Sequence, residues 1–493
     1  MSYNAIPHDS LQQVDPVPLP DPLEGSQPSE GDTFDESSSG GASWISAVIN
    51  LLNTIVGAGI LAMPFAMKQN GILLGSLLIL LSGSAAASGL YLQGLCSSFL
   101  PRGKASFFAV AQITYPSLSV VFDLAIAVKC FGVGVSYLII IEDLMPQISD
   151  FFGYSGVFQS RLFWLTIAMA ISGPLSFLRK LDSLKYTSLV ALLSVGYLIV
   201  LVAVRFFIEP LPPTSDINFV YPQSFSSVLS VLPVLIFGFT CHQNMFSAVN
   251  ELGGKRTESV FVTIVASSIY PAAAMYLLVG IVGYLTFGSS VGGNVIAMYP
   301  YSLSTIVGRL AIVVLVLFSY PLQAHPCRAS VANVVHWVIS RVRSDNGSYY
   351  FATLEREEPE LEVVSQYSVR SVHVSHLSLG MHLGVTLVII IFSFITASKV
   401  TSLEVMLAFV GSTGSTAISF ILPGLFGYAL LKKLVLTGSA PDFNRKFYGS
   451  DEPSERSSYL SKSRVIKNLA FVLFVLGVCL MVLCLGINLW LRW

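Results

Sequence analysis

The sequence predicts an all-α membrane protein, and two observations carry this prediction. Hydrophobic residues make up 53% of the 493 residues and charged residues only 11%, and the mean hydropathy is +0.71. Ordinary globular domains contain roughly a quarter charged residues. Long apolar runs also recur almost to the last residue, each close to or above the ~20 residues that a helix needs to cross a bilayer. We therefore expect one polytopic domain in a lipid bilayer, and the net charge of −1 gives no reason to expect nucleic acid as a partner.

The chain divides into a polar tail and a long apolar domain. Residues 1–43 are rich in Pro, Ser, Gly, Asp and Glu and contain no Lys or Arg, which predicts a disordered acidic tail. Residues 44–491 form the expected membrane domain. Its eleven predicted spans are 44–68, 72–97, 119–143, 161–178, 185–208, 225–250, 258–286, 303–327, 376–397, 403–431 and 465–491. Residues 328–375 are the longest connection, which we expect to be a loop.

Lysine and arginine residues are distributed unequally between the two ends of the spans. If the N-terminus is cytosolic, the cytosolic segments hold twenty of these residues and the opposite side holds five. Because cytosolic loops carry the excess of positive charge, we predict a cytosolic N-terminus and a cytosolic loop 328–375. An odd number of spans then places Trp493 on the lumenal side.

The first span is interrupted near its midpoint by polar residues and glycines. Asn53 and Thr54 precede Gly57-Ala58-Gly59. Glycines in membrane helices also serve close helix packing, but backbone released from helical bonding inside hydrocarbon is costly unless polar groups satisfy it. We therefore predict a broken helix that binds a ligand.

The sixth span contains a second interruption of the same kind. Pro233 and Gly238 are followed by Thr240, Cys241 and His242 within an otherwise apolar run. Spans one and six are corresponding members of two five-helix repeats, and if the repeats are inverted, the two breaks meet near the membrane midplane. Half-helix N-termini suit a carboxylate, while unwound carbonyl groups suit an ammonium group. An amino acid offers both groups.

Four stretches carry a resemblance to a known family. They are the first-span motif Asn50–Pro64, the segment Phe239–Phe246 with Asn250-Glu251-Leu252, the segment Lys129–Leu138, and the segment Pro321–Arg328. Through them, residues 44–491 resemble the amino acid/auxin permease family, in particular fungal vacuolar amino acid transporters and animal sodium-coupled neutral amino acid transporters. The resemblance implies a LeuT-like 5+5 inverted repeat with eleven transmembrane helices, of which helices 1 and 6 are broken. No enzyme is expected, because the spans contain no paired Asp, HExxH or Ser/Lys arrangement.

The resemblance also implies which residues bind the substrate. Backbone N–H groups around Gly57, Ala58 and Gly59, beside Thr54, are expected to meet the carboxylate. Carbonyl groups of the second break are expected to meet the amine, which adds Phe237, Gly238, Phe239 and Thr240 to the candidate site. Phe237 or Phe239 closes over the substrate in this reading, and in the alternative reading both are ordinary core aromatics.

Four residues are candidates for coupling to an ion or a proton. Sodium-coupled relatives have a hydroxyl in span eight at the position that matches Ser319, with Asn53 as a contributor from span one, so these two could hold sodium. Alternatively, Ser319 bonds to its own backbone. Lys129 lies mid-span, where a charge costs at least ~2.5 kcal/mol, so it requires a partner, water or the loss of its proton. His242 couples protons or only joins two helices.

The remaining expectation for the membrane domain concerns a salt bridge. Arg309, near the outer end of span eight, is expected to pair with Glu142 or Asp143, as an outer gate or as a structural contact.

The combined prediction is a monomeric secondary active transporter without a cofactor. Neither break contains a carboxylate, Lys or Arg that would neutralise a charged substrate side chain, which favours neutral amino acids. We expect transport by alternating access, driven by protons and directed from the vacuole to the cytosol. The vacuolar location is implied by the resemblance. Two alternatives stay open: a sodium-coupled importer at the plasma membrane, and an amino acid sensor that does not transport.

Overall fold

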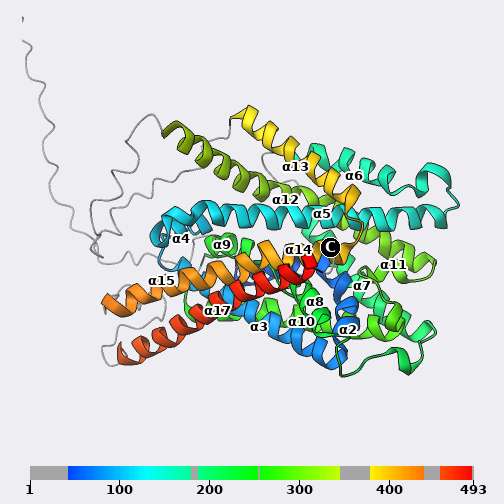
Figure 1. Ribbon diagram of the computed structural model, residues 1–493, viewed down its shortest axis with the longest axis horizontal. Coiled ribbons are helices and arrows are strands. Elements are labelled where there is room, and N and C mark those ends of the chain that lie inside the picture. The colour runs from blue at the N-terminus through cyan, green and yellow to red at the C-terminus, as the bar shows by residue number, and fades with distance from the viewer. Residues whose placement is uncertain (1–42, 179–186, 254–255, 345–377, 438–455, 491–493) are drawn as a thin grey trace, which may run out of the picture. The chain divides into compact units, whose positions relative to one another are not determined.

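The computed structural model describes residues 43–178, 187–253, 256–344, 378–437 and 456–490, and the regular elements in these ranges are all helices (Figure 1). Nine of the described helices are long and apolar enough to cross a membrane, and Trp44–Ile55 with Ala58–Asn70 forms a tenth span, bent by 43°. The all-α membrane fold is therefore confirmed. Residues 1–42 of the expected tail, residues 345–375 of the predicted loop and Trp493 lie outside the described residues.

The described residues form a series of helices. In order, they are α1 (Trp44–Ile55), η2 (Ala58–Ala62), α2 (Met63–Asn70), α3 (Ile72–Ser97), α4 (Phe107–Thr114), α5 (Ser119–Phe151), α6 (Arg161–Ser176), α7 (Thr187–Ile208), α8 (Phe225–Gly238), α9 (His242–Glu251), α10 (Glu258–Phe287), α11 (Val295–Met298), α12 (Leu303–Ser344), α13 (Leu379–Lys399), α14 (Leu403–Val410), α15 (Leu422–Thr437) and α17 (Arg456–Trp490). Serine begins many of them, because its side-chain oxygen accepts a hydrogen bond from a free N–H group of the first turn. Such serine caps occur at Ser43, Ser106, Ser160, Ser224, Ser378 and Ser402.

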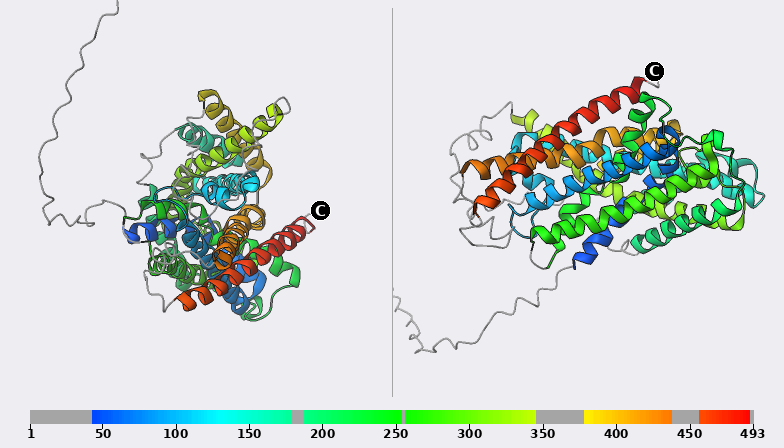
Figure 2. Two further views of the ribbon diagram at one scale, coloured as in Figure 1. Left: turned by 90° about the vertical axis from the view of Figure 1, so that its left-hand side faces the viewer. Right: turned by 90° about the horizontal axis from the view of Figure 1, so that it is seen from below.

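The two long helices α5 and α12 lie side by side in the bundle, with α6 and α13 packed against them (Figure 1). At 1.5 Å per residue, the 42 residues of α12 extend for about 63 Å, roughly twice the thickness of the hydrocarbon core. The helix therefore continues through residues 328–344, which were expected to belong to the loop. By contrast, α17 lies at the edge of the bundle (Figure 2) and most of its apolar side chains are exposed, as suits a helix that faces lipid.

The short helix α6 explains why the predicted count of eleven spans is not confirmed. Its 16 residues extend for about 24 Å, less than the ~30 Å hydrocarbon core. The carbonyl groups at a helix C-terminus have no partner inside the helix. Here the buried Arg328 donates to Ser176 O at 2.6 Å, and His382 Nε2 lies 3.0 Å from Phe177 O. These two side chains allow α6 to end within the bundle.

Between α14 and α15, two stretches of π-helix (Gly411–Ser415 and Ala417–Ile421) replace the ordinary α-helical turns. Glycines let this segment touch its neighbours closely. A Cβ atom on Gly411 would lie 1.9 Å from Pro233 O in α8, and one on Gly414 would lie 2.6 Å from Lys129 Cβ in α5. The segment is thereby packed directly behind the second break and Lys129.

Candidate functional site

The two interrupted helices touch each other at glycines. α1 ends at Ile55, Gly57 has a non-helical backbone (φ −127°, ψ −139°), and the helix resumes at Ala58. α8 ends at Gly238, and α9 begins at His242. A Cβ atom on Gly59 would lie 3.0 Å from the Cα atom of Gly238, and one on Gly238 would lie 2.9 Å from the Met63 side chain, so both glycines leave room for close packing at the breaks. The prediction that helices 1 and 6 are broken is confirmed, and the breaks meet.

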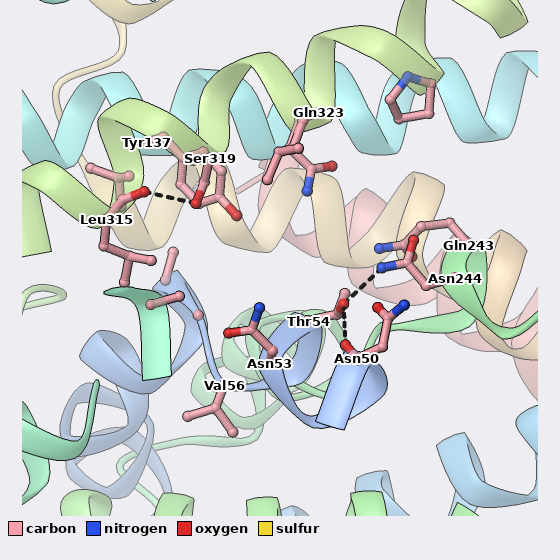
Figure 3. A pocket seen from close by; sticks show the side chains of 16 residues that line it. Asn50, Asn53, Thr54, Val56, Tyr137, Gln243, Asn244, Leu315, Ser319 and Gln323 are labelled. Atoms are coloured by element: carbon pink, nitrogen blue, oxygen red, sulfur yellow. Dashed lines mark hydrogen bonds between the residues drawn. The ribbon is translucent and has the colours of Figure 1, made fainter. Parts of the chain in front are cut away.

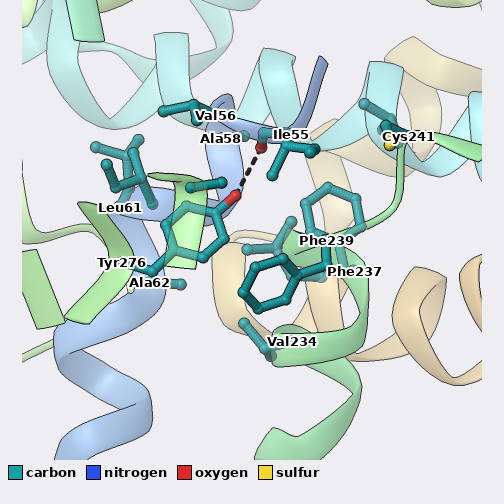
Figure 4. Packing of buried hydrophobic residues seen from close by; sticks show 14 of the residues in the cluster. Ile55, Val56, Ala58, Leu61, Ala62, Val234, Phe237, Phe239, Cys241 and Tyr276 are labelled. Carbon is teal, nitrogen blue, oxygen red and sulfur yellow. Dashed lines mark hydrogen bonds between the residues drawn. The ribbon is translucent and has the colours of Figure 1, made fainter. Parts of the chain in front are cut away.

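A tyrosine from a third helix joins the two breaks. The Tyr276 hydroxyl of α10 lies 2.6 Å from Ile55 O and 2.8 Å from Gly238 O (Figure 4). Because a hydroxyl has one hydrogen to donate, the two carbonyl groups share a single donor. Tyr276 is fully buried and was not singled out in the sequence, since a tyrosine inside an apolar run has no local signature. The two carbonyl groups are thus partly satisfied by the protein.

A cavity of about 270 Å³ lies beside the first break, between α1, α5, α9 and α12. Figure 3 shows Asn53 and Thr54 on one wall and Ser319 and Gln323 on the opposite wall. Asn244 Nδ2 donates to Thr54 Oγ1 at 2.7 Å, which ties α9 to α1 at the edge of the cavity. Of the predicted site residues, this cavity is lined by Asn53, Thr54, Gly57, Ala58 and Ser319.

The described lining of this cavity combines polar and apolar residues and carries no formal charge. Five of its side chains are amides, namely Asn50, Asn53, Gln243, Asn244 and Gln323. Gln243 and Gln323 each keep a buried side-chain oxygen without a hydrogen-bond partner, so these amides have bonding capacity left for a ligand. Sequence analysis did not select Gln323, because one amide on a membrane helix gives no hint of which helix it faces.

A second, smaller cavity of about 20 Å³ adjoins the first at the breaks themselves. The two cavities share lining residues, among them Thr54, Gly57 and Tyr137. The small cavity brings together four further predicted residues, namely Gly59, Lys129, Phe237 and Thr240, the last of which lies in the second break. Among the described residues that line either cavity, Lys129 is the one with a formal charge.

Three predicted residues lie outside both cavities. Gly238 forms the contact with Gly59, and the fully buried Phe239 packs edge-on against Tyr276 with ring centroids 5.1 Å apart. His242 is also fully buried, with Nε2 3.1 Å from Ala86 O and Nδ1 3.1 Å from the Ser419 hydroxyl. Both of its ring nitrogens are therefore already bonded to neighbouring helices.

The residues that line the large cavity become more exposed toward the end of the bundle at which α1 begins. Along α1, exposure rises from the buried Val56 through the half-buried Asn53 to the exposed Asn50. Along α12, it rises from the buried Val316 to the half-buried Pro326. On both helices, the lining residues nearer this end of the bundle are the more exposed ones, and we take this end as the open end of the cavity.

At the other end, the expected salt bridge of Arg309 was wrong. The buried Arg309 instead donates to carbonyl groups at the end of α11, including Tyr299 O at 2.6 Å. The partner of Asp143 and Glu142 is Arg161 at the start of α6, at 2.9 and 3.5 Å. The four-residue helix α11 leaves buried carbonyl groups that need a donor, and Arg309 supplies it.

Comparison with known proteins identifies similar sequences. A family model described as "Transmembrane amino acid transporter protein" matches residues 40–438. "Vacuolar amino acid transporter 5" of Schizosaccharomyces pombe is 43% identical over 91% of this chain and 95% of its own length. "Vacuolar amino acid transporter 6" of Saccharomyces cerevisiae is 39% identical over 90% of this chain and 98% of its own. "Sodium-coupled neutral amino acid transporter 7" of Danio rerio is 28% identical over 60% and 65%.

A solved structure supports the fold independently. Mhp1 in its inward facing conformation covers 91% of this chain and 90% of its own, with 12% identity and a TM-score of 0.52. At this identity the likeness concerns the fold alone, and it agrees with the LeuT-like arrangement of two paired breaks.

Proposed function

Since the chain belongs to the transmembrane amino acid transporter family, we propose that it is a secondary active transporter that moves neutral amino acids by alternating access. The family consists of transporters and not of enzymes. The cavity beside the paired breaks is the observation that carries this proposal. Its volume of about 270 Å³ suits a small molecule, and its described lining offers amides and backbone groups without a carboxylate. Such a lining favours a substrate whose side chain is uncharged.

We propose that a proton rather than sodium drives transport. Asn53 and Ser319 face the same cavity and offer oxygen atoms that would suit sodium, although the Ser319 hydroxyl already donates to Leu315 O at 2.7 Å. Lys129 lines the adjoining cavity, and its charge would repel a cation there, because charges interact strongly in a medium of low dielectric constant. Lys129 is accordingly our first candidate for the coupling residue, and His242, which lies outside both cavities, is the weaker one.

The vacuolar membrane is the proposed location, with the N-terminus in the cytosol. Two relatives that share 39–43% identity carry vacuolar names, and the distribution of Lys and Arg favours this orientation. In this orientation the open end of the large cavity faces the cytosol, which corresponds to the state that releases substrate after transport from the lumen.

The experiment that tests this proposal is uptake of labelled L-glutamine into proteoliposomes under imposed gradients. We expect a pH gradient to stimulate uptake, an ionophore that collapses it to abolish the stimulation, and a sodium gradient at constant pH to have no effect. Stimulation by sodium without a response to pH would contradict proton coupling. Binding of glutamine without flux would instead support the sensor alternative, and a panel of acidic, basic and neutral amino acids would test the substrate class.

A further inference from the structure

Lys129 is a buried lysine in the middle of α5 that has no acidic partner. Its residue is 3% exposed, and no hydrogen bond or salt bridge of its ammonium group is formed within the described residues. The ionisable groups near it are the Cys130 and Cys241 thiols and the His242 ring, none of which is a carboxylate. A buried cation is costly unless an anion accompanies it, so the arrangement calls for an anion that the protein does not supply.

The helix packing holds the lysine in place. Behind it, the π-helical segment lies so close that a Cβ atom on Gly414 would overlap Lys129 Cβ at 2.6 Å. One turn further along, a Cβ atom on Gly132 would overlap the Val410 side chain at 2.1 Å. With its backbone fixed between these neighbours, Lys129 lines the small cavity at the breaks.

A second part of the lining of the small cavity is also suited to an anion. It is formed by Gly57, Ala58 and Gly59, where the bent helix Ala58–Asn70 begins. The first N–H groups of a helix have no intrahelical acceptor, and they carry the positive end of the helix dipole. Lys129 and a helix N-terminus therefore line the same small cavity, so two sources of positive charge border one space.

The sizes of the two cavities fit one ligand that occupies both. A volume of about 20 Å³ holds roughly one water-sized group, since a single water needs about 10–15 Å³. This suits a carboxylate oxygen but not a whole amino acid. The adjoining cavity of about 270 Å³ has room for the rest of the molecule, and Tyr137 and Gln323 line both spaces.

We propose that the Lys129 ammonium group binds the α-carboxylate of the substrate, in a subsite that it forms with the backbone of Ala58 and Gly59. This inference rests on the proposed transport of amino acids. It adds substrate recognition to the proton-coupling role proposed above for Lys129, because the protonated ammonium group is the form that binds the carboxylate. The amide-lined cavity then receives the side chain of the amino acid.

The test measures whether Lys129 and the α-carboxylate depend on each other. Inhibition of labelled L-glutamine uptake is measured for L-glutamine and for L-glutamine α-amide, in which the carboxylate is replaced by a neutral amide. The wild-type protein is expected to prefer glutamine by about tenfold or more, because a hydrogen bond to a charged group is lost with the amide. A wild-type protein that accepts both compounds equally would overturn the proposal without any variant.

The variant Lys129→Gln completes the cycle. In this variant, inhibition of uptake by glutamine is expected to weaken by about tenfold or more, and inhibition by the α-amide by less than about threefold. The preference for glutamine over the α-amide should therefore nearly disappear. If inhibition by both compounds weakens equally, or if the preference for glutamine is unchanged, Lys129 does not bind the carboxylate. Lys399→Gln, at an exposed lysine at the end of α13, is the matched control and should keep the wild-type preference.

Two further measurements separate the possible failures. Thermal stabilisation of the detergent-solubilised wild-type protein by each compound reports binding even where flux is low. If the wild-type protein neither binds nor transports glutamine or any other amino acid of the panel, the proposed function itself falls. If it binds or transports them and Lys129→Gln is without selective effect, only the present inference falls.

Discussion

The contact between the two breaks can be tested by adding one methyl group to Gly59. In Gly59→Ala, the new Cβ atom would lie 3.0 Å from the Cα atom of Gly238, 3.6 Å from the Phe237 ring and 3.6 Å from the Tyr276 hydroxyl. The first of these atoms belongs to the backbone and cannot rotate away. The two broken helices must therefore move apart by a few tenths of an ångström.

The size of the effect follows from the cost of overpacking. Extra carbon atoms in a close-packed interior typically cost about 1–3 kcal/mol, which corresponds to about a 5- to 150-fold lower population of the arrangement in which the breaks touch. If transport requires this arrangement, the initial rate of glutamine uptake should fall by at least about fivefold.

The assay compares uptake per inserted molecule in proteoliposomes, with the amount of protein measured for each variant. Gly196→Ala is the matched control, because it makes the same change within the apolar helix α7, where an added Cβ atom would meet nothing within 4 Å. The control should transport like the wild-type protein. Wild-type uptake by a normally inserted Gly59→Ala variant would refute the claim that the breaks must touch.

Three further predictions concern single side chains of the site. Tyr276→Phe removes the donor shared by two buried carbonyl groups, so the free energy of unfolding should fall by about 1–3 kcal/mol and uptake should be slower. Unchanged thermal stability would contradict the role of the hydroxyl. Gly57→Leu should insert normally, since the nearest atom to an added Cβ is Thr54 O at 3.9 Å. Its side chain would enter the cavities, so flux should be lost, and normal flux would argue that the substrate does not occupy them. His242→Asn should lower stability by about 1–3 kcal/mol and leave the pH dependence of uptake unchanged, whereas an altered pH dependence would assign proton coupling to His242.

The sequence allowed the fold and both breaks to be predicted because these depend on local chemistry. Gly57 and Gly59 among apolar residues, and Gly238 followed by polar residues, are unusual wherever they occur in a membrane span. The pairing of spans one and six followed from their positions in the two repeats.

What the sequence did not reveal depends on contacts between distant segments. The role of Tyr276 arises only where α10 passes both breaks, and Arg161 rather than Arg309 meets Asp143 because of how α6 begins. The early end of α6 likewise depends on Arg328, which is 152 residues away from Ser176 in the chain. Such contacts have no periodicity or motif that a single sequence displays.

The shared hydroxyl of Tyr276 has a consequence for the order in which the helices move. Because one hydrogen serves Ile55 O and Gly238 O, either half of the site can leave α10 while the hydrogen bond passes to the other, and the number of bonds does not change. If both halves left at once, two buried carbonyl groups would lose their donor together. The tyrosine thus favours stepwise motion, in which its single hydrogen bond passes between α1 and α8 as they move one after the other. Motion of both helices as one rigid body is disfavoured.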